Sequence, residues 1–190
     1  MIAPADVALG ILAGGRGERV GGRDKAWLLR GGLPALDGLL TELKVQAFGQ
    51  RLASVRDEDA RWAARGFRCV PDLRPGQPGP LAGIEALAAA CTTPWLLLLP
   101  VDVFDLPPGL FDRLAALASP NGCCLRDAGG LQPLVGLWPR AALGQAASAA
   151  LAAGEGAVHR ALVTLQPATL DVTPRRLGNA NTPDAYDGAP

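Results

Sequence analysis

The chain has 190 residues, of which 49% are apolar and only 5% aromatic, and its 18 basic and 18 acidic residues leave no net charge at pH 7. A neutral total argues against a general binder of nucleic acid or of anionic membranes, because such partners select an excess or a patch of positive charge. The length suits one domain over residues 1–190, which can bury roughly 70% of the surface that the unfolded chain exposes.

The four cysteines lack the signature of a zinc site, because no C-x-x-C pair and no neighbouring pair of histidines accompanies them. Cysteines of this kind are typical small apolar core residues of proteins in a reducing compartment. No basic region precedes an apolar stretch at the amino terminus, and no apolar run is long enough to span a membrane. We therefore expect a cytoplasmic protein. The cysteines are Cys69, Cys91, Cys123 and Cys124.

The first predicted element is a buried strand at residues 7–11, which leads directly into a loop at 12–25 with five glycines and four cationic side chains. Glycine lets backbone N–H groups approach phosphate oxygens closely, so this composition suits a polyphosphate. Val20 stands where the dinucleotide fingerprint needs glycine, and Arg23 where the P-loop needs lysine, so neither template fits. A flexible surface loop is the alternative, but the carboxyl end of the first strand is where open α/β sheets bind ligands.

The next segments alternate between helices and strands. Apolar residues at helical spacing predict a helix with one buried stripe from Pro34 to about Ala47. A strand at 50–55, a short charged helix at 56–65 with an acidic first turn, and a strand at 67–71 follow.

A loop at residues 72–83 begins at Asp72 and holds three prolines and three glycines. Pro80 is well placed as the first residue of a helix that runs to Ala90. By composition alone a rigid connector is a better explanation of this loop than a binding loop.

The most apolar strand is predicted at residues 93–101, and it ends at Asp102. A run that is apolar on both faces is typical of a central parallel strand. A carboxylate at the carboxyl end of such a strand is placed to hold Mg²⁺ against phosphate oxygens. The alternative is an ordinary surface aspartate at a strand end.

The remaining predicted elements include a hairpin whose turn lies at 127–130. His159, the single histidine, is more typical of a solvated or capping residue than of a catalyst. Thr182 and Pro183 are typical of a helix start. In order, the elements are a helix at 107–118, an edge strand at 123–126, a strand at 131–138, helices at 141–153 and 157–163, and a strand at 169–172.

Strands that alternate with helices predict a three-layer α/β/α domain with a mostly parallel sheet and one antiparallel hairpin. The segments at 12–25, 72–83 and 102 all follow strands. Because the carboxyl ends of parallel strands meet at one edge of a sheet, these segments are expected to converge on one cleft.

The same segments resemble the molybdenum cofactor guanylyltransferases, which have the nucleotide-diphospho-sugar-transferase fold. Leu-Ala-Gly-Gly at 12–15 and Arg-Val-Gly-Gly-x-Asp-Lys at 19–25 are similar to the family's signature loop. Pro-Gly-Pro-Leu-Ala-Gly at 78–83 and the Asp-containing segment at 100–108 resemble its second and third motifs, and Asn-x-Asn-Thr-Pro at 179–183 resembles its last.

The resemblance implies transfer of GMP from GTP to the phosphate of molybdopterin, with Mg²⁺ as cofactor and release of pyrophosphate. Molybdoenzymes or other cofactor-biosynthesis proteins are the candidate protein partners. It implies catalytic roles for Lys25, Arg19 and Asp102, with the metal on Asp102. Nucleotide binding is implied for Leu12, Ala13, Gly14, Gly15, Lys25, Asp72 and Asp102, and substrate binding for Gln132, Asn179 and Asn181.

Five residues depart from the family pattern: Val20 replaces Met, Val55 replaces Asn, Val103 replaces Thr, Phe104 replaces Pro and Gln132 replaces His. Valine cannot hydrogen-bond to a nucleotide, and glutamine does not titrate near neutral pH. Two alternatives therefore stay open: a related nucleotidyltransferase that uses CTP or another phosphorylated acceptor, and a non-catalytic nucleotide-binding or cofactor-binding homologue.

Overall fold

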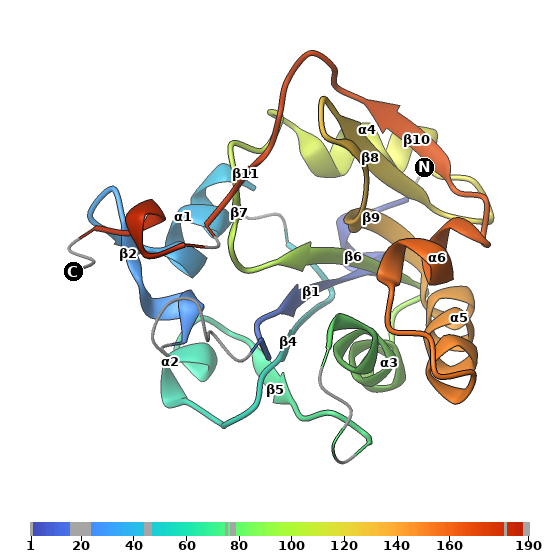
Figure 1. Ribbon diagram of the computed structural model, residues 1–190, viewed down its shortest axis with the longest axis horizontal. Helices are drawn as coiled ribbons and strands as arrows, with labels where there is room; N and C mark the ends of the chain where they lie inside the picture. Colours follow the sequence, from blue (N-terminus) through green and yellow to red (C-terminus); the bar gives the residue numbers. More distant parts are fainter. Residues whose placement is uncertain are drawn as a thin grey trace.

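A seven-stranded sheet in the order β10-β8-β9-β6-β1-β4-β5 forms the centre of the molecule (Figure 1). The computed structural model describes residues 2–15, 24–43, 47–74, 76, 79–180 and 182–187. Four of the strand pairs are parallel, whereas β9 runs antiparallel to both of its neighbours, β6 and β8. The predicted mostly parallel α/β sheet with an antiparallel hairpin is confirmed. The strands are β1 (Val7–Leu12), β4 (Gln50–Ser54), β5 (Arg68–Val70), β6 (Trp95–Pro100), β8 (Cys123–Asp127), β9 (Gly130–Pro139) and β10 (Ala168–Asp171).

Helices cover both faces of this sheet. One apolar core joins α1, α2 and α4 to one face, and a second joins α3, α5 and α6 to the other. Figure 1 shows α3, α5 and α6 gathered together on the second face. The helices are α1 (Ala35–Glu42), α2 (Ala60–Ala63), α3 (Pro80–Ala90), α4 (Leu110–Leu117), α5 (Arg140–Ala152) and α6 (Val158–Val163).

The central strands are apolar on both faces because each face meets a helical layer. In β1, Leu9 and Ile11 point into the first core and Ala8 into the second. Gly10 also faces the second layer, where a Cβ would lie 3.0 Å from Leu96 Cδ1, so glycine allows β6 and α3 to pack closely there. The buried run of β6 confirms its predicted central position.

Short elements outside the seven-stranded sheet complete the fold. They are the 3-10 helices η1 (Pro4–Asp6), η3 (Lys25–Trp27) and η4 (Pro183–Ala185), and the strand pairs β2 (Leu29–Arg30) with β3 (Leu33–Pro34) and β7 (Val103–Phe104) with β11 (Gly178–Asn179). The last pair joins the segment after β6 to the carboxyl-terminal part of the chain (Figure 1).

Two predicted helix boundaries were wrong. The first helix ends at Glu42, because the chain must turn into β4, where Gly49 N donates hydrogen bonds to Val7 O and Pro4 O. The second begins only at Ala60, since the Asp59 carboxylate caps it by accepting from Arg61 N at 2.8 Å. The acidic pair at 57–58 therefore precedes the helix instead of forming its first turn.

The strand predicted at the edge of the sheet, β8, lies inside it. β10 pairs with β8 in parallel and forms the edge instead. The crossover through α5 and α6 that returns the chain to this position leaves no local signal in the sequence of β8. All four cysteines are free, and Cys91, Cys123 and Cys124 are buried as expected of apolar core residues. Within the described ranges, every helix is too short or too polar to cross a bilayer.

Candidate functional site

A cleft of about 920 Å³ opens where β1, β4, β5 and β6 end and α3 begins. This is the carboxyl edge of the parallel part of the sheet, the edge at which open α/β folds bind ligands. Six of the residues predicted from sequence line it: Leu12, Gly14, Gly15, Asp72, Asp102 and Asn179.

Asp102, which lines this cleft, pairs with the opposite charge of Lys25, which does not line it. Lys25 Nζ donates to Asp102 Oδ2 at 2.6 Å, although the two residues are 77 positions apart in the chain. Their side chains are 21% and 13% exposed, so both charges are held largely out of water. Lys25 is placed by η3, whose cap is Asp24, the acceptor of a hydrogen bond from Ala26 N at 2.9 Å.

Asp102 is fixed through its own backbone and that of its neighbour. Val101 N donates to Leu12 O at 3.1 Å, which ties the end of β6 to the end of β1. Ala180 N donates to Asp102 O at 2.9 Å, which brings in the carboxyl-terminal segment. The carboxylate is thereby positioned between the first loop and Asn179.

The start of the glycine-rich loop is anchored to β4. Ala13 N donates to Ser54 O at 2.9 Å, so this amide is already used, and Ala13 is not among the residues that line the cleft. A Cβ on Gly14 would contact Ser54 Oγ at 3.6 Å, whereas a Cβ on Gly15 would meet open space. Gly15 therefore leaves its side of the backbone open to a ligand in the cleft.

The loop after β5 contributes Asp72 and a cation that sequence reasoning missed, Arg74. Partial desolvation raises the pKa of Asp72 above its ordinary value. Arg74 lines the cleft and makes a bidentate ion pair with Glu85 of α3, with Nε–Oε2 and Nη2–Oε1 distances of 2.9 and 2.7 Å. Its Nη2 also donates to Ser148 Oγ of α5 at 3.0 Å. Hydrogen bonding from Arg74 lowers the pKa of Glu85.

The ion pair between Arg74 and Glu85 could have been sought in the sequence. Glu85 is the one charged residue among the buried side chains of α3. A buried charge requires a partner, and Arg74 is the nearest preceding cation in the chain.

Gln132 lies on β9 and does not line the cleft, where Leu134 of the same strand is found. Its Nε2 donates to Asp127 Oδ1 at 3.0 Å. Asp127 is only 3% exposed and also accepts from Gly129 N at 2.8 Å and from Leu177 N at 2.9 Å. Burial acts to raise the pKa of Asp127, but these hydrogen bonds outweigh it and lower the pKa. The sequence indicated only a turn at Asp127, since the contact with Leu177 is far away in the chain.

Two of the predicted site residues, Arg19 and Asn181, lie outside the described residues. His159 is exposed on α6 and does not line the cleft. Val55 is buried at the end of β4 and lines the cleft with an apolar surface.

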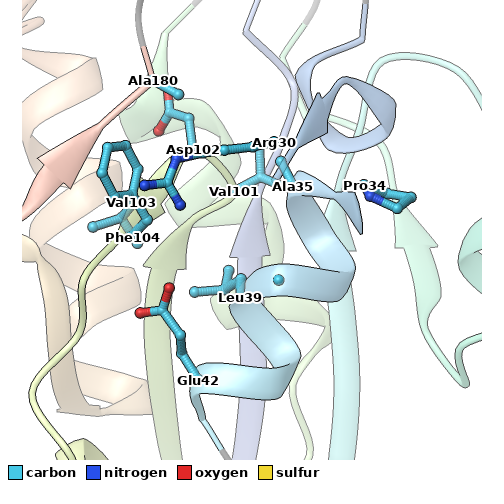
Figure 2. A pocket seen from close by; sticks show the side chains of 11 residues that line it. Arg30, Pro34, Ala35, Leu39, Glu42, Val101, Asp102, Val103, Phe104 and Ala180 are labelled. Carbon is cyan, nitrogen blue, oxygen red and sulfur yellow. The ribbon is translucent and has the colours of Figure 1, made fainter. Parts of the chain in front are cut away.

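A second, much smaller cavity lies behind Asp102 (Figure 2). Its volume is about 20 Å³, which is enough for one water molecule but not for a nucleotide. Arg30 and Phe104 enclose it near Asp102, and Glu42 enters from α1 (Figure 2). The Glu42 carboxylate accepts a hydrogen bond from Leu106 N at 2.7 Å and thus holds the segment that follows β7. This cavity is part of the support for Asp102.

The residues at the cleft fit a divalent cation that is bound together with its substrate. Among the described residues, no cluster of three or more His, Cys, Asp or Glu could hold a metal without help. A single carboxylate combined with substrate phosphates is the usual way in which proteins bind Mg²⁺. Asp102 offers that carboxylate beside the cationic Lys25.

Comparison with known proteins identifies the family of this chain. The MobA-like NTP transferase domain family matches residues 9–168. A molybdenum cofactor guanylyltransferase of Pseudomonas paraeruginosa is 36% identical over 179 residues, which cover 92% of this chain and 89% of the relative. One of Cereibacter sphaeroides is 42% identical over 153 residues, which cover 78% of this chain and 76% of the relative.

Solved structures share the fold at low sequence identity. Molybdopterin-guanine dinucleotide biosynthesis protein A from Archaeoglobus fulgidus superposes with a TM-score of 0.67 at 19% identity, over 94% of each chain. A mycobacterial homologue of Rv0371c gives a TM-score of 0.70 at 18% identity, over 96% of this chain and 94% of the other. The match to the family and the two guanylyltransferase relatives show that this chain belongs to the MobA-like NTP transferase family.

Proposed function

We propose that this protein is a molybdenum cofactor guanylyltransferase, which transfers GMP from GTP to the phosphate of molybdopterin and releases pyrophosphate. The names of its relatives support this reaction, since those that cover most of the chain are guanylyltransferases of this cofactor. The observation that carries the proposal is the contact between Lys25 and Asp102, a residue that lines a cleft large enough for a nucleotide.

The proposed nucleotide site extends from the first loop to the loop after β5. The backbone of residues 12–15 would hold the base and ribose, and Asp72, which also lines the cleft, would contact the nucleoside. Lys25 would turn from Asp102 towards the phosphates, as a compact positive charge on a flexible stem allows. Arg19, which lies outside the described residues, is proposed as a second phosphate-binding cation.

The chemical step requires positioning and charge neutralisation more than proton transfer. An oxygen of the molybdopterin phosphate attacks the α-phosphorus of GTP, a new P–O bond forms, and the bond from the α-phosphorus to the bridging oxygen breaks to release pyrophosphate. The nucleophile is already an anion, so no side-chain base is needed. Lys25 neutralises charge that develops on the phosphoryl oxygens, which is the usual source of catalysis by preorganised charge. Mg²⁺ held by Asp102 would supply Lewis-acid stabilisation of the same oxygens.

The acceptor is proposed to bind on the side of the cleft formed by Asn179 and β9. Asn179 lines the cleft close to Asp102, and Asn181, outside the described residues, is proposed to act with it. Gln132 does not line the cleft and its amide nitrogen is engaged by Asp127, so it is proposed to contact, through Oε1, only a part of the acceptor that extends along β9 beyond the cleft.

The wider setting of the enzyme is also proposed. Residues 1–190 are taken as one domain, because a single sheet runs through nearly all of the described chain. We propose that the protein acts in the cytoplasm and that molybdoenzymes or other cofactor-biosynthesis proteins receive the product, as the family reaction implies.

The test is turnover of the purified protein with molybdopterin and each of the four NTPs in the presence of Mg²⁺. We expect pyrophosphate release and a guanine dinucleotide product with GTP only. A preference for CTP would contradict the assignment of GTP as the substrate. Val55, which replaces Asn, would then be the first residue to examine as the cause. Nucleotide binding without pyrophosphate release would instead favour a non-catalytic nucleotide-binding protein.

A further inference from the structure

Phe104, one of the departures from the family pattern, lies two residues after Asp102 and packs against two partners. Arg30 Cζ lies 3.3 Å from the centroid of its ring. Gly178 is paired directly with Phe104 between β11 and β7. A Cβ added to Gly178 would overlap ring atoms Cδ2, Cε2 and Cζ, so the ring lies against the Gly178 backbone and only glycine fits there.

The ring lies where three segments that carry predicted site residues meet. Arg30 belongs to β2, five residues after Lys25, and Gly178 immediately precedes Asn179. Figure 2 shows the guanidinium of Arg30 beside the Phe104 ring, with Asp102 next to both.

Hydrogen bonds hold the same three segments together around the ring. The Tyr186 hydroxyl donates to Ala180 O at 2.9 Å, which fixes the segment after β11. Asp187 N donates to Leu29 O at 2.7 Å, and Gly32 N donates to Asp187 Oδ2 at 2.7 Å. The carboxyl-terminal segment is thus fastened to both β7 and the β2–β3 hairpin, and Phe104 fills the space between them.

We propose that Phe104 is a positioning residue for the transfer reaction, because its ring sets the placement of Lys25, Asp102 and Asn179 relative to one another. The inference rests on the proposed function. A guanidinium stacked on an aromatic face is attracted to it electrostatically, and a flat ring covers a glycine backbone better than a branched side chain does. Leucine at 104 would keep the apolar volume but lose both contacts, and the three segments would then shift.

The test compares Phe104→Leu with Phe111→Leu, the same change in a buried phenylalanine of α4 that packs edge-on against Phe48. Both variants lose an aromatic contact, so both are expected to melt at lower temperature than the wild type. Misplacement of reacting groups by about 1 Å can cost about 100-fold in rate, so we expect kcat of Phe104→Leu to fall by about 10- to 100-fold. Phe111→Leu is expected to keep kcat, and Phe104→Tyr, which retains the ring, is expected to recover it. Equal kcat values for the two leucine variants would overturn the proposal.

Arg30→Met provides a second, less disruptive variant if Phe104→Leu does not fold. It removes the cation from the ring, and we expect it to lower kcat in the same direction as Phe104→Leu. When Phe104→Leu and Arg30→Met are combined, kcat should fall no further than with Phe104→Leu alone, because both substitutions remove the same contact. A folded Arg30→Met protein with wild-type kcat would overturn the role of the stack.

Failure of the proposed function has a different readout. If the wild-type protein transfers no guanylyl group, the same variants are compared by their affinity for GTP in the presence of Mg²⁺. Weaker binding by Phe104→Leu than by Phe111→Leu would still support a positioning role, and equal affinities would refute it.

Discussion

The ion pair between Lys25 and Asp102 has separable consequences for stability and for catalysis, which a double-mutant cycle can resolve. Lys25→Met and Asp102→Asn each remove one charge of this ion pair, at a site where both side chains are mostly buried. Loss of one partner of a fully buried pair costs about 3–5 kcal/mol, and we discount this to about 2 kcal/mol for the partial exposure here. For a chain of this length, that corresponds to a lower melting temperature by about 4–8 °C.

The double variant Lys25→Met with Asp102→Asn should recover most of this stability, because no uncompensated charge is left. Its turnover should not recover. Each single variant is expected to lose about 100-fold or more in kcat, as removal of a preorganised charge typically does, and the double variant should remain at least as slow. Differential scanning calorimetry and pyrophosphate release measure the two effects. Single variants that melt like the wild type, or turn over within about threefold of it, would refute the reasoning.

Three further predictions concern the residues around the cleft. Glu85, whose pKa is lowered by Arg74, stabilises the fold above the pKa of the unfolded chain. Its contribution is lost as the pH falls, because the unfolded state binds protons first. Glu85→Gln should therefore show a shallower loss of stability below about pH 4.5 in acid denaturation. Asp127→Ala removes the acceptor of three hydrogen bonds, so we expect the free energy of unfolding measured in urea to fall by about 2–3 kcal/mol. A variant as stable as the wild type would contradict this prediction. Gly83→Ala would place a Cβ 2.6 Å from Ser54 Oγ, so we expect α3 to shift and the free energy of unfolding to fall by about 1–2 kcal/mol. The shift should also weaken GTP binding measured by calorimetry, and an unchanged affinity for GTP would contradict this prediction.

The meeting of Lys25 and Asp102 could be predicted from the sequence because it depends on simple geometry. Each follows an apolar strand, and β1 and β6 prove to be neighbours that run in parallel. Parallel neighbours bring the residues after their carboxyl ends together whatever the separation along the chain. The start of α3 at Pro80 was predictable for a local reason, because proline is favoured at the first helical position.

Features that depend on distant partners could not be predicted in the same way. The interior position of β8 results from the return of β10 to its side, and no residue of β8 signals that pairing. Asp127 has the sequence of a turn residue, and its third hydrogen-bond donor, Leu177, follows 50 residues later. Phe104 departs from the family motif, and its partners become evident only when Arg30 and Gly178 are seen beside it.

The most direct test of the account is a calorimetric titration of GTP into the wild-type protein and Asp102→Asn, with and without Mg²⁺. The account predicts that Mg²⁺ tightens GTP binding to the wild type and has little effect on the variant, because Asp102 is the carboxylate that holds the metal against the phosphates. An equal effect of Mg²⁺ on both proteins would show that the metal and the nucleotide do not meet at Asp102, and would contradict the proposed site.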